Sequence, residues 1–373
     1  MSDWADKLPR SFDVIDRGMR DGLHVGAQLH VRLADDVIVD AGVGIARDGV
    51  QMTSDSMMIW MSSSKPITAI AIAQLIERGQ LDLDDAIATH IPEFGQNGKE
   101  TITIRHALTH TGGFRGVASR YDALPWPQTI EAICNARIEP NWTPGEKAGY
   151  HIASSWYILG EIVQRLGGVP FDRYVRENLF LPLGMADSWI GMPAEQYAAY
   201  GNRLGVMHQT DGGTIRPHPS LDSLAATVSP RPGSNGRGPM REMARFYRML
   251  LRARRGDPTG AALVGLSPAT IDTFTPRQRV GMFDNTFRLA VDWGLGFIVN
   301  TMNDDMAKFA YGFGPHASAD TFGHGGNQSS LAMADPDRDL IVAVVFNGMP
   351  GEPAHAARMR ALTTAVYEDL SLA

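Results

Sequence analysis

Cysteine is nearly absent from the sequence. Its single copy, Cys134, cannot form an internal disulfide bond. No stretch approaches the roughly 18 consecutive apolar residues of a membrane-spanning helix. Residues 1–22 also contain no apolar segment long enough for a secretory signal peptide. These absences predict a cytoplasmic protein that does not associate with membranes.

Clusters of basic residues are also missing. Asp and Glu outnumber Lys and Arg by 41 to 34, for a formal net charge of −7. We therefore do not expect nucleic acid or an anionic membrane as a partner. Internal repeats and low-complexity tracts are absent as well, and 44% of the 373 residues are hydrophobic. This composition predicts a globular protein whose domains share a large core.

Strand patterns occur near both ends of the chain. Residues 26–41 alternate apolar and polar side chains on both sides of an Asp-Asp pair, which predicts a β-hairpin. Residues 329–347 predict two strands around an Asp-Pro-Asp turn, and residues 293–300 predict a third strand beside them. The chain then ends in an amphipathic helix, whose apolar positions follow helical spacing: Met359, Leu362, Val366 and Leu370.

The middle of the chain has mostly helical patterns. Two apolar stripes at helical spacing run along Ile158, Leu159, Ile162, Val163 and Leu166, and along Met243, Phe246, Tyr247, Leu250 and Leu251. We therefore predict an α+β fold, in which an antiparallel sheet built from the N- and C-terminal segments is flanked by helices and a mostly helical domain is inserted. The expected domains are residues 1–85 together with 285–373, and residues 86–284. The active site is expected in the cleft between them.

One segment combines a charge with an apolar helix. In IWMSSSKPITAIAIAQLIERG, Lys65 precedes an almost wholly apolar helix, and Ser62 lies one helical turn before it on the same face. Burial can lower the pKa of a lysine by roughly 3 units, about 4 kcal/mol, so that its neutral amine accepts a proton from the serine. That transfer would make the hydroxyl of Ser62 a nucleophile. The alternative is a lysine that only packs at the helix end, with Ser63 or Ser64 as a helix cap.

A tyrosine further along the chain is a candidate partner for this serine. Tyr150 occurs in a polar stretch just before an amphipathic helix, where its phenol could share proton transfer with a lysine amine. The alternative is a half-buried aromatic anchor. The next residue, His151, is a rival base because an unperturbed imidazole titrates near neutrality, and we rank it second.

Two glycines follow a histidine in FGHGGNQSSLAMADP. Gly325 and Gly326 lead into a predicted strand and would let a substrate lie against the backbone. The backbone N–H groups of Ser62 and Asn327 would hold the oxyanion of an acyl-transfer reaction, and one such donor is typically worth about 3 kcal/mol. His324 is expected to orient or polarise the bound acyl group, although a glycine turn also suits a structural histidine.

Two other motifs point to different chemistry but are incomplete. GLSPA, residues 265–269, lacks the last glycine of the Gly-x-Ser-x-Gly motif of α/β-hydrolases. HALTH places His106 and His110 four residues apart, the spacing of two zinc ligands on a helix. It has neither the glutamate of His-Glu-x-x-His nor an evident third ligand. We therefore expect no metal and no other cofactor.

The order of the motifs Ser-x-x-Lys, Tyr and His-Gly-Gly resembles that of the serine β-lactamase and penicillin-binding protein family, particularly its class C-related branch with the family VIII carboxylesterases. The stretches ITIRHALTHTGGF, LPLGMADSWIG and GHGGNQSSLAMADPDRDLIVAVVFNGM extend the resemblance over roughly residues 20–368. Tyr-His-Ile replaces the Tyr-Ser/Ala-Asn of lactamases, and His-Gly-Gly replaces their Lys-Thr-Gly. Both departures resemble the esterase branch, since the missing lysine would pair with a β-lactam carboxylate.

The resemblance implies a serine hydrolase that cleaves carboxylic esters with short-chain or small acyl groups through an acyl-enzyme on Ser62. Lys65 would be the general base and Tyr150 the general acid and base. The oxyanion and substrate-binding group would comprise Ser62, His151, His324, Gly325, Gly326 and Asn327. The expected partner is a small-molecule ester, and the oligomeric state stays open.

Two alternatives remain at this point. The first is an acyltransferase, or a weak β-lactamase or amidase, that uses the same acyl-enzyme. The second is a non-catalytic protein that resembles a penicillin-binding protein and only binds its ligand.

Overall fold

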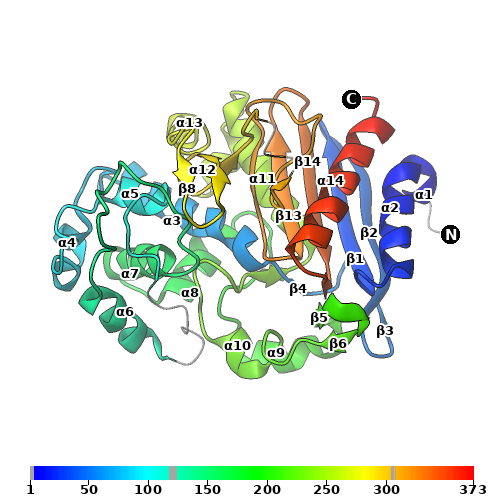
Figure 1. The fold of residues 1–373 in the computed structure, drawn as a ribbon, viewed down its shortest axis with the longest axis horizontal. Helices are drawn as coiled ribbons and strands as arrows, with labels where there is room; N and C mark the ends of the chain where they lie inside the picture. Colours follow the sequence, from blue (N-terminus) through cyan, green and yellow to red (C-terminus); the bar gives the residue numbers. More distant parts are fainter. Residues whose placement is uncertain (1–3, 117–123, 304–305, 307) are drawn as a thin grey trace.

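The computed structural model describes residues 4–116, 124–303, 306 and 308–373. Figure 1 shows a sheet with helices on its faces on one side of the molecule and a group of helices on the other. The sheet has eight strands in the order β10-β11-β12-β13-β14-β1-β2-β3, and every neighbouring pair is antiparallel. Their bounds are β1 Gly26–Leu33, β2 Asp36–Arg47, β3 Val50–Gln51, β10 Asp292–Trp293, β11 Ile298–Val299, β12 Phe322–Gly325, β13 Ser330–Asp335 and β14 Leu340–Phe346.

Both terminal segments contribute to this sheet, as the sequence predicts. The hairpin expected at residues 26–41 is β1 with β2, and the pair expected at residues 329–347 is β13 with β14. Strand β14 also pairs with β1, so the two ends of the chain meet in the middle of the sheet. The predicted α+β fold with an antiparallel sheet is confirmed.

The stretch 293–300 is not the single strand that its apolar character predicts. It contains the end of β10 and the whole of β11, which pair with each other as a tight hairpin. Gly294 donates its N–H to the carbonyl of Phe297 at 2.9 Å, and Gly296 has a φ of +83°. A left-handed backbone at Gly296 turns the chain back on itself, which no strand pattern reveals.

Alternation along the central strand β14 divides the core into two layers. Val342, Val344 and Phe346 belong to the layer that also contains residues of helices α2 (Pro9–Arg20) and α14 (Glu352–Asp369). Ile341, Ala343 and Val345 belong to the layer with α11 (Met240–Arg254). Figure 1 shows α2 and α14 side by side over one face of the sheet. A strand covered on both faces can be apolar throughout, as β14 is.

The remaining elements include the helical group and several short strand pairs. The helices are α1 Trp4–Lys7, α3 Lys65–Glu77, α4 Ile87–His90, α5 Ile104–Leu108, α6 Trp126–Asn135, α7 Ser154–Gly167, α8 Phe171–Val175, α9 Ala194–Tyr200, α10 Leu224–Val228, α12 Thr259–Leu263 and α13 Pro268–Phe274. The short strands are β4 Met58–Ile59 with β7 Arg237–Gly238, β5 His208–Gln209 with β6 Arg216–Pro217 and β15 Gly348–Met349, and β8 Phe283–Asp284 with β9 Leu289–Ala290. None of the described helices is long and apolar enough to cross a membrane.

Helix α3 lies between the sheet and the helical group in Figure 1. Its residues from Lys65 to Leu75 are all buried, which fits its nearly uniform apolar sequence. Helix α11 lies within the range 86–284 expected for the helical domain, yet it packs against the sheet strands β1, β13 and β14. The sheet region and the helical region therefore share a continuous core. The predicted division of the chain after residues 85 and 284 remains a prediction.

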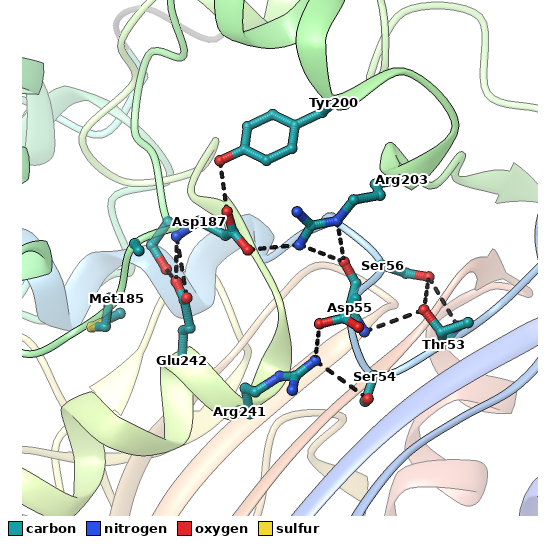
Figure 2. A network of polar contacts seen from close by, with 12 residues as sticks. Thr53, Ser54, Asp55, Ser56, Met185, Asp187, Tyr200, Arg203, Arg241 and Glu242 are labelled. Carbon is teal, nitrogen blue, oxygen red and sulfur yellow. Dashed lines mark hydrogen bonds and ion pairs between the residues drawn. The ribbon is translucent and has the colours of Figure 1, made fainter.

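A network of polar contacts, the Asp187 network, anchors the segment that leads into β4 (Figure 2). Asp187 accepts hydrogen bonds from the Tyr200 hydroxyl at 2.9 Å and from Arg203 at 2.6 Å. Arg203 also donates to the backbone carbonyl of Asp55, and Arg241 of α11 pairs with the Asp55 carboxylate. These contacts fix the chain shortly before it reaches Ser62.

Candidate active site

Ser62 lies at the junction between strand β4 and helix α3. A short 3-10 helix, Met61–Ser64, precedes α3 directly. Met61 has a φ of +50°, so the backbone turns sharply immediately before the serine. Lys65 is the first residue of α3, and its Nζ lies 2.9 Å from Ser62 Oγ. The spacing of one helical turn therefore brings the two groups into hydrogen-bond contact.

The amine of Lys65 is wholly buried. It donates to the carbonyl of Gly233 at 2.9 Å, and it lies 5.0 Å from the ring centre of Tyr150 and 5.5 Å from that of Trp156. Among the described residues no carboxylate pairs with it. Burial lowers the pKa of Lys65 well below its ordinary value because water no longer solvates the ammonium. A neutral amine can donate one N–H to Gly233 and accept the hydroxyl proton of Ser62.

The two serines that follow have structural contacts. Ser63 donates to the carbonyl of His324 at 2.8 Å and lies 2.9 Å from Ser330 Oγ. Ser64 donates to the carbonyl of Met61 at 2.6 Å and accepts the N–H of Gly236 at 2.9 Å. Neither serine caps α3 with its side chain, which corrects the alternative reading of the sequence. They instead tie the start of α3 to its neighbours.

Tyr150 is held close to Lys65 by its own backbone. Its N–H donates to Asp284 Oδ1 at 2.9 Å, and its carbonyl accepts the Thr286 hydroxyl at 3.0 Å. Asp284 also pairs with Arg279 at 3.1 Å, and both side chains are at most 1% exposed. Arg279 in turn donates to the carbonyls of Thr109 and Val291. The ion pair therefore connects Tyr150 with the segment 279–291, more than a hundred residues further along the chain, and with Thr109.

The sequence motifs alone did not identify Asp284 or Arg279. No short pattern surrounds either residue, and their partners are distant along the chain. The available signal was weak: an arginine and an aspartate five residues apart on either side of four non-polar residues. Only the fold shows that this pair is buried under Tyr150.

The structure does not bring His151 to the reacting groups. Its side chain is fully buried, its Nδ1 lies 2.8 Å from Ser155 Oγ, and its backbone N–H donates to His110 Nδ1 at 3.0 Å. Burial lowers the pKa of His151 to about 3, with smaller contributions from Arg115 and Arg279. His151 does not line the cavity of Ser62, contrary to its expected place in the substrate-binding group, and its ring packs against those of His110 and Phe114.

The HALTH histidines serve two different structural roles. His106 accepts the N–H of Thr103 at 3.1 Å and completes the N-terminal cap of α5. His110 lies beyond the end of α5 with a φ of +60°, and its ring packs 4.7 Å from that of Tyr150. The two imidazoles are thus not on one helix face. In the described ranges, no cluster of three or more His, Cys, Asp or Glu is arranged to hold a metal ion.

His324 is on the opposite side of the site, in strand β12. Its Nδ1 lies 2.7 Å from the carbonyl of Gly325, so this nitrogen carries the proton and Nε2 is left with its lone pair. Burial, with the neighbouring Lys65 as a second cause, lowers the pKa of His324 to about 3. A neutral imidazole of this tautomer accepts a hydrogen bond and does not donate one through Nε2.

The glycines after His324 permit a close backbone approach to the serine. A Cβ on Gly326 would lie 2.4 Å from the carbonyl oxygen of Trp60 and 2.8 Å from the Cβ of Met61, so no side chain fits there. This contact brings the loop that carries Asn327 against the turn that carries Ser62. Within the described parts of the chain, the backbone N–H groups of Ser62 and Asn327 have no hydrogen-bond partner. Both remain available for an oxyanion.

Helix α14 holds the far end of this loop. Arg358 is 4% exposed and donates to the carbonyls of Gln328, Gly348 and Leu23 at 3.1, 3.0 and 2.9 Å. Gln328 has a φ of +47° and accepts the N–H of Gly351 through its side chain at 2.6 Å. Arg358 thus fixes a strained turn immediately after Asn327.

A cavity of about 970 Å³ connects these groups. Ser62, Tyr150, His324, Gly325 and Asn327 all line it. The other side chains that line the cavity are mainly apolar. Some belong to the sheet region, including α14, and others belong to loops of the helical region. A nucleophile with its base, a phenol and backbone N–H groups at one end of an apolar cavity form an arrangement suited to acyl transfer.

Comparison with known proteins agrees with this geometry. A family model described as Beta-lactamase matches residues 12–366. The chain is 26% identical, over an alignment 391 positions long, to a protein named Esterase EstB from Burkholderia gladioli. The alignment covers 95% of both chains. Among solved structures it is similar to a penicillin-binding protein homologue from Caulobacter crescentus, with a TM-score of 0.80, 28% identity and 98% of both chains covered.

A second solved structure, titled as a family VIII carboxylesterase, has a TM-score of 0.75 at 24% identity and covers 97% of both chains. At this identity the likeness concerns the fold. The resemblance predicted from the three motifs is confirmed, and the chain belongs to the Beta-lactamase family, with the fold of serine β-lactamases and penicillin-binding proteins.

Proposed function

We propose that this protein is a serine hydrolase that cleaves carboxylic esters through an acyl-enzyme on Ser62. The observation that carries the proposal is the contact of 2.9 Å between Ser62 Oγ and a wholly buried lysine amine. A lysine whose pKa is lowered by burial can act as a base toward the hydroxyl that it contacts. The chain belongs to the Beta-lactamase family and is similar to a protein named Esterase EstB, and both findings support hydrolase activity.

In the proposed reaction, Lys65 accepts the proton of Ser62 as its Oγ attacks the ester carbonyl. The N–H groups of Ser62 and Asn327 stabilise the oxyanion. Tyr150 delivers a proton to the leaving alkoxide, and the alcohol departs. Tyr150, now a phenolate, takes a proton from water, which attacks the acyl-enzyme. The acid is released as Lys65 returns its proton to Ser62.

The site chemistry favours a neutral ester over a β-lactam. His324 occupies the place where lactamases carry a lysine, and its neutral imidazole offers a lone pair instead of a positive charge. A substrate carboxylate at this position would lack its cationic partner. We propose that any β-lactamase activity is a weak side reaction. The expected cytoplasmic location is a further part of this proposal.

The proposal is tested by ester turnover and covalent labelling together. We expect hydrolysis of p-nitrophenyl acetate by the parent and its loss in Ser62→Ala, and we expect a fluorophosphonate to label the peptide that contains Ser62. Ser63→Ala provides a matched control that removes the neighbouring hydroxyl. Equal turnover in Ser62→Ala and the parent would refute the nucleophile, and a parent that neither turns over esters nor takes the label would indicate a ligand-binding protein.

Acyl transfer to an alcohol is the nearest competing reaction because it uses the same acyl-enzyme. Adding methanol or a small amine to the assay and measuring the ratio of ester or amide product to free acid separates the two. We expect free acid to dominate, because water is far more concentrated in the assay than the added acceptor.

A further inference from the structure

Three aromatic side chains form a continuous wall of the cavity. Phe287, Phe309 and Tyr311 all line it, and we call them the aromatic wall. The ring centres of Phe287 and Phe309 are 5.0 Å apart, those of Phe309 and Tyr311 are 5.6 Å apart, and those of Phe287 and Tyr311 are 6.0 Å apart. These separations are typical of interacting rings. The wall therefore offers a preformed surface for another ring system.

The wall begins at the proposed catalytic tyrosine. The ring of Phe287 stacks on that of Tyr150, with centres 4.7 Å apart and planes inclined by 30°. The backbone N–H of Phe287 donates to Asp284 Oδ1 at 3.1 Å, the same oxygen that accepts the N–H of Tyr150. One buried carboxylate thus fixes both residues, so the wall keeps its position relative to the phenol.

This position distinguishes the two halves of an ester. In the proposed reaction Tyr150 gives its proton to the leaving alkoxide, so the alcohol half must lie within reach of the phenol. The acyl half is attached to Ser62 and is held by the backbone N–H groups of Ser62 and Asn327. A group that extends from the alcohol oxygen past Tyr150 therefore meets Phe287 first and then Phe309.

The size and polarity of the cavity agree with a large alcohol half. Its volume of about 970 Å³ is at the upper end of typical ligand sites, far more than a short-chain ester fills. Leu221, Leu289 and Met349 add further apolar side chains to the lining. A small ester would leave this surface hydrated, whereas a ring system removes it from water.

We propose that the substrate class is esters whose alcohol half is a bulky aromatic group bound on the aromatic wall. This inference rests on the proposed ester hydrolysis at Ser62 and specifies which half of the substrate determines specificity. Phe287 and Phe309 are then specificity-determining residues, acting on binding of the alcohol half.

The experiment compares acetates whose leaving groups are similarly acidic but differ in size: vinyl acetate, phenyl acetate and 2-naphthyl acetate. We expect kcat/KM to increase along this series, by at least tenfold from vinyl to 2-naphthyl acetate. A second series keeps p-nitrophenol as the leaving group and lengthens the acyl half from acetate to hexanoate. We expect a smaller change in that series, because the acyl half does not reach the wall.

Variants of the wall provide the second measurement. Phe287→Leu and Phe309→Leu keep apolar side chains but remove the rings, and each should lower the ratio of kcat/KM for 2-naphthyl over vinyl acetate by roughly threefold to tenfold. Phe283→Leu is the matched control, because Phe283 belongs to the same β8–β9 hairpin but is 51% exposed and does not line the cavity. It should leave the ratio unchanged.

Each outcome bears on one proposal. A flat vinyl-to-naphthyl series, a preference that follows the acyl half, or wall variants with the parent ratio would overturn the assignment of the alcohol half while ester hydrolysis at Ser62 stands. Failure of the parent to hydrolyse any of these esters, or hydrolysis by Ser62→Ala at the parent rate, would instead refute the proposed function. Circular dichroism and thermal unfolding of each variant show that the fold is retained.

Discussion

The reacting centre around Ser62 and Lys65 and the partly exposed Asp187 network differ in how their charged groups are paired. In the Asp187 network, carboxylates accept hydrogen bonds from guanidinium, hydroxyl or backbone N–H groups: Arg203 and Tyr200 donate to Asp187, and the backbone N–H of Asp187 donates to Glu242 at 3.1 Å (Figure 2). At the reacting centre, Lys65 has no carboxylate among the described residues. The Nε2 atoms of His110, His151 and His324 are likewise without a hydrogen-bond partner there.

The pKa shifts follow from this difference. Burial raises the pKa of Asp187, but the hydrogen bonds from Arg203 and Tyr200 outweigh it and leave that pKa below its ordinary value. At Lys65 nothing opposes burial, and the pKa falls far. Paired charges hold segments together, whereas an unpaired buried amine becomes a base at neutral pH. The predictions below test this contrast, from the largest effect to the smallest.

The largest effect is expected from removing the base. Lys65→Met should lower kcat/KM for p-nitrophenyl acetate by about three orders of magnitude, because Ser62 then loses the group that accepts its proton. Lys65→Arg should be equally inactive, since a guanidinium stays protonated at any working pH. Steady-state kinetics with active-site titration measures the change. Retention of a tenth or more of the parent activity by either variant would contradict the assigned role.

Removing the phenol is expected to cost somewhat less. Tyr150→Phe should lower kcat by about two orders of magnitude, since protonation of the leaving alcohol and activation of water both use the hydroxyl. The ring keeps its stacking on Phe287, so stability should change little. Pre-steady-state kinetics should reveal slower acylation and slower deacylation. A defect confined to one of these two steps would limit the role of Tyr150 to that step.

The pH dependence of activity and of stability distinguishes Lys65 from the nearby histidines. The pKa values of His151 and His324 are both about 3, so neither changes protonation near neutrality. A rise of kcat/KM with pH near neutrality therefore comes from neither histidine, and we assign it to Lys65, whose protonated form cannot accept the Ser62 proton. Profiles of kcat/KM for the parent should show one ascending limb well below the ordinary lysine value of about 10.4.

The stability effect of Lys65 has a definite sign. Its pKa is lower in the folded state than in the unfolded state, so between the two values the unfolded chain binds more protons and stability rises with pH. Lys65→Met removes this dependence. As pH falls between the two pKa values, the free energy of unfolding of the parent should therefore decrease relative to that of Lys65→Met. Urea unfolding at a series of pH values measures the difference, and parallel curves would rule out the depressed pKa.

The ion pair beneath Tyr150 should affect both properties. Asp284→Asn leaves the Arg279 guanidinium buried without its partner, which should cost about 3 kcal/mol of unfolding free energy. The amide NH2 cannot accept from Arg279, so the side chain that holds the Tyr150 backbone should shift and kcat should also fall by about tenfold. Asp284→Glu, which keeps the charge, should recover part of both. Loss of stability with an unaltered kcat would make the pair purely structural.

The smallest effect is expected in the Asp187 network. Asp187→Asn should cost about 1 kcal/mol of unfolding free energy and leave kcat unchanged, because its side chain does not line the cavity. The contribution of Asp187 should be present at neutral pH and disappear as pH falls through its depressed pKa. Matched unfolding and kinetic measurements on Asp187→Asn and Asp284→Asn compare the two regions directly.

The sequence predicted what depends on short spacings. Alternation predicted the hairpin at residues 26–41 and an Asp-Pro-Asp turn predicted the one at residues 329–347. The spacing of Ser62 and Lys65 implied that their side chains meet. It could not predict the tight turn at Gly296, where a single left-handed residue divides an apolar run. It also could not predict that Asp284 supports Tyr150, because that contact spans 134 residues and is formed only when the chain folds.

The most direct test of the account is the titration of the Lys65 amine itself. The lysines of the chain are Lys7, Lys65, Lys99, Lys147 and Lys308. With so few of them, protein labelled with ¹³C at lysine Cε should give a resolved spectrum. The signal lost in Lys65→Met assigns Lys65. We predict that this signal titrates well below the ordinary lysine value of about 10.4. A Lys65 signal that titrates at that ordinary value would contradict the central claim.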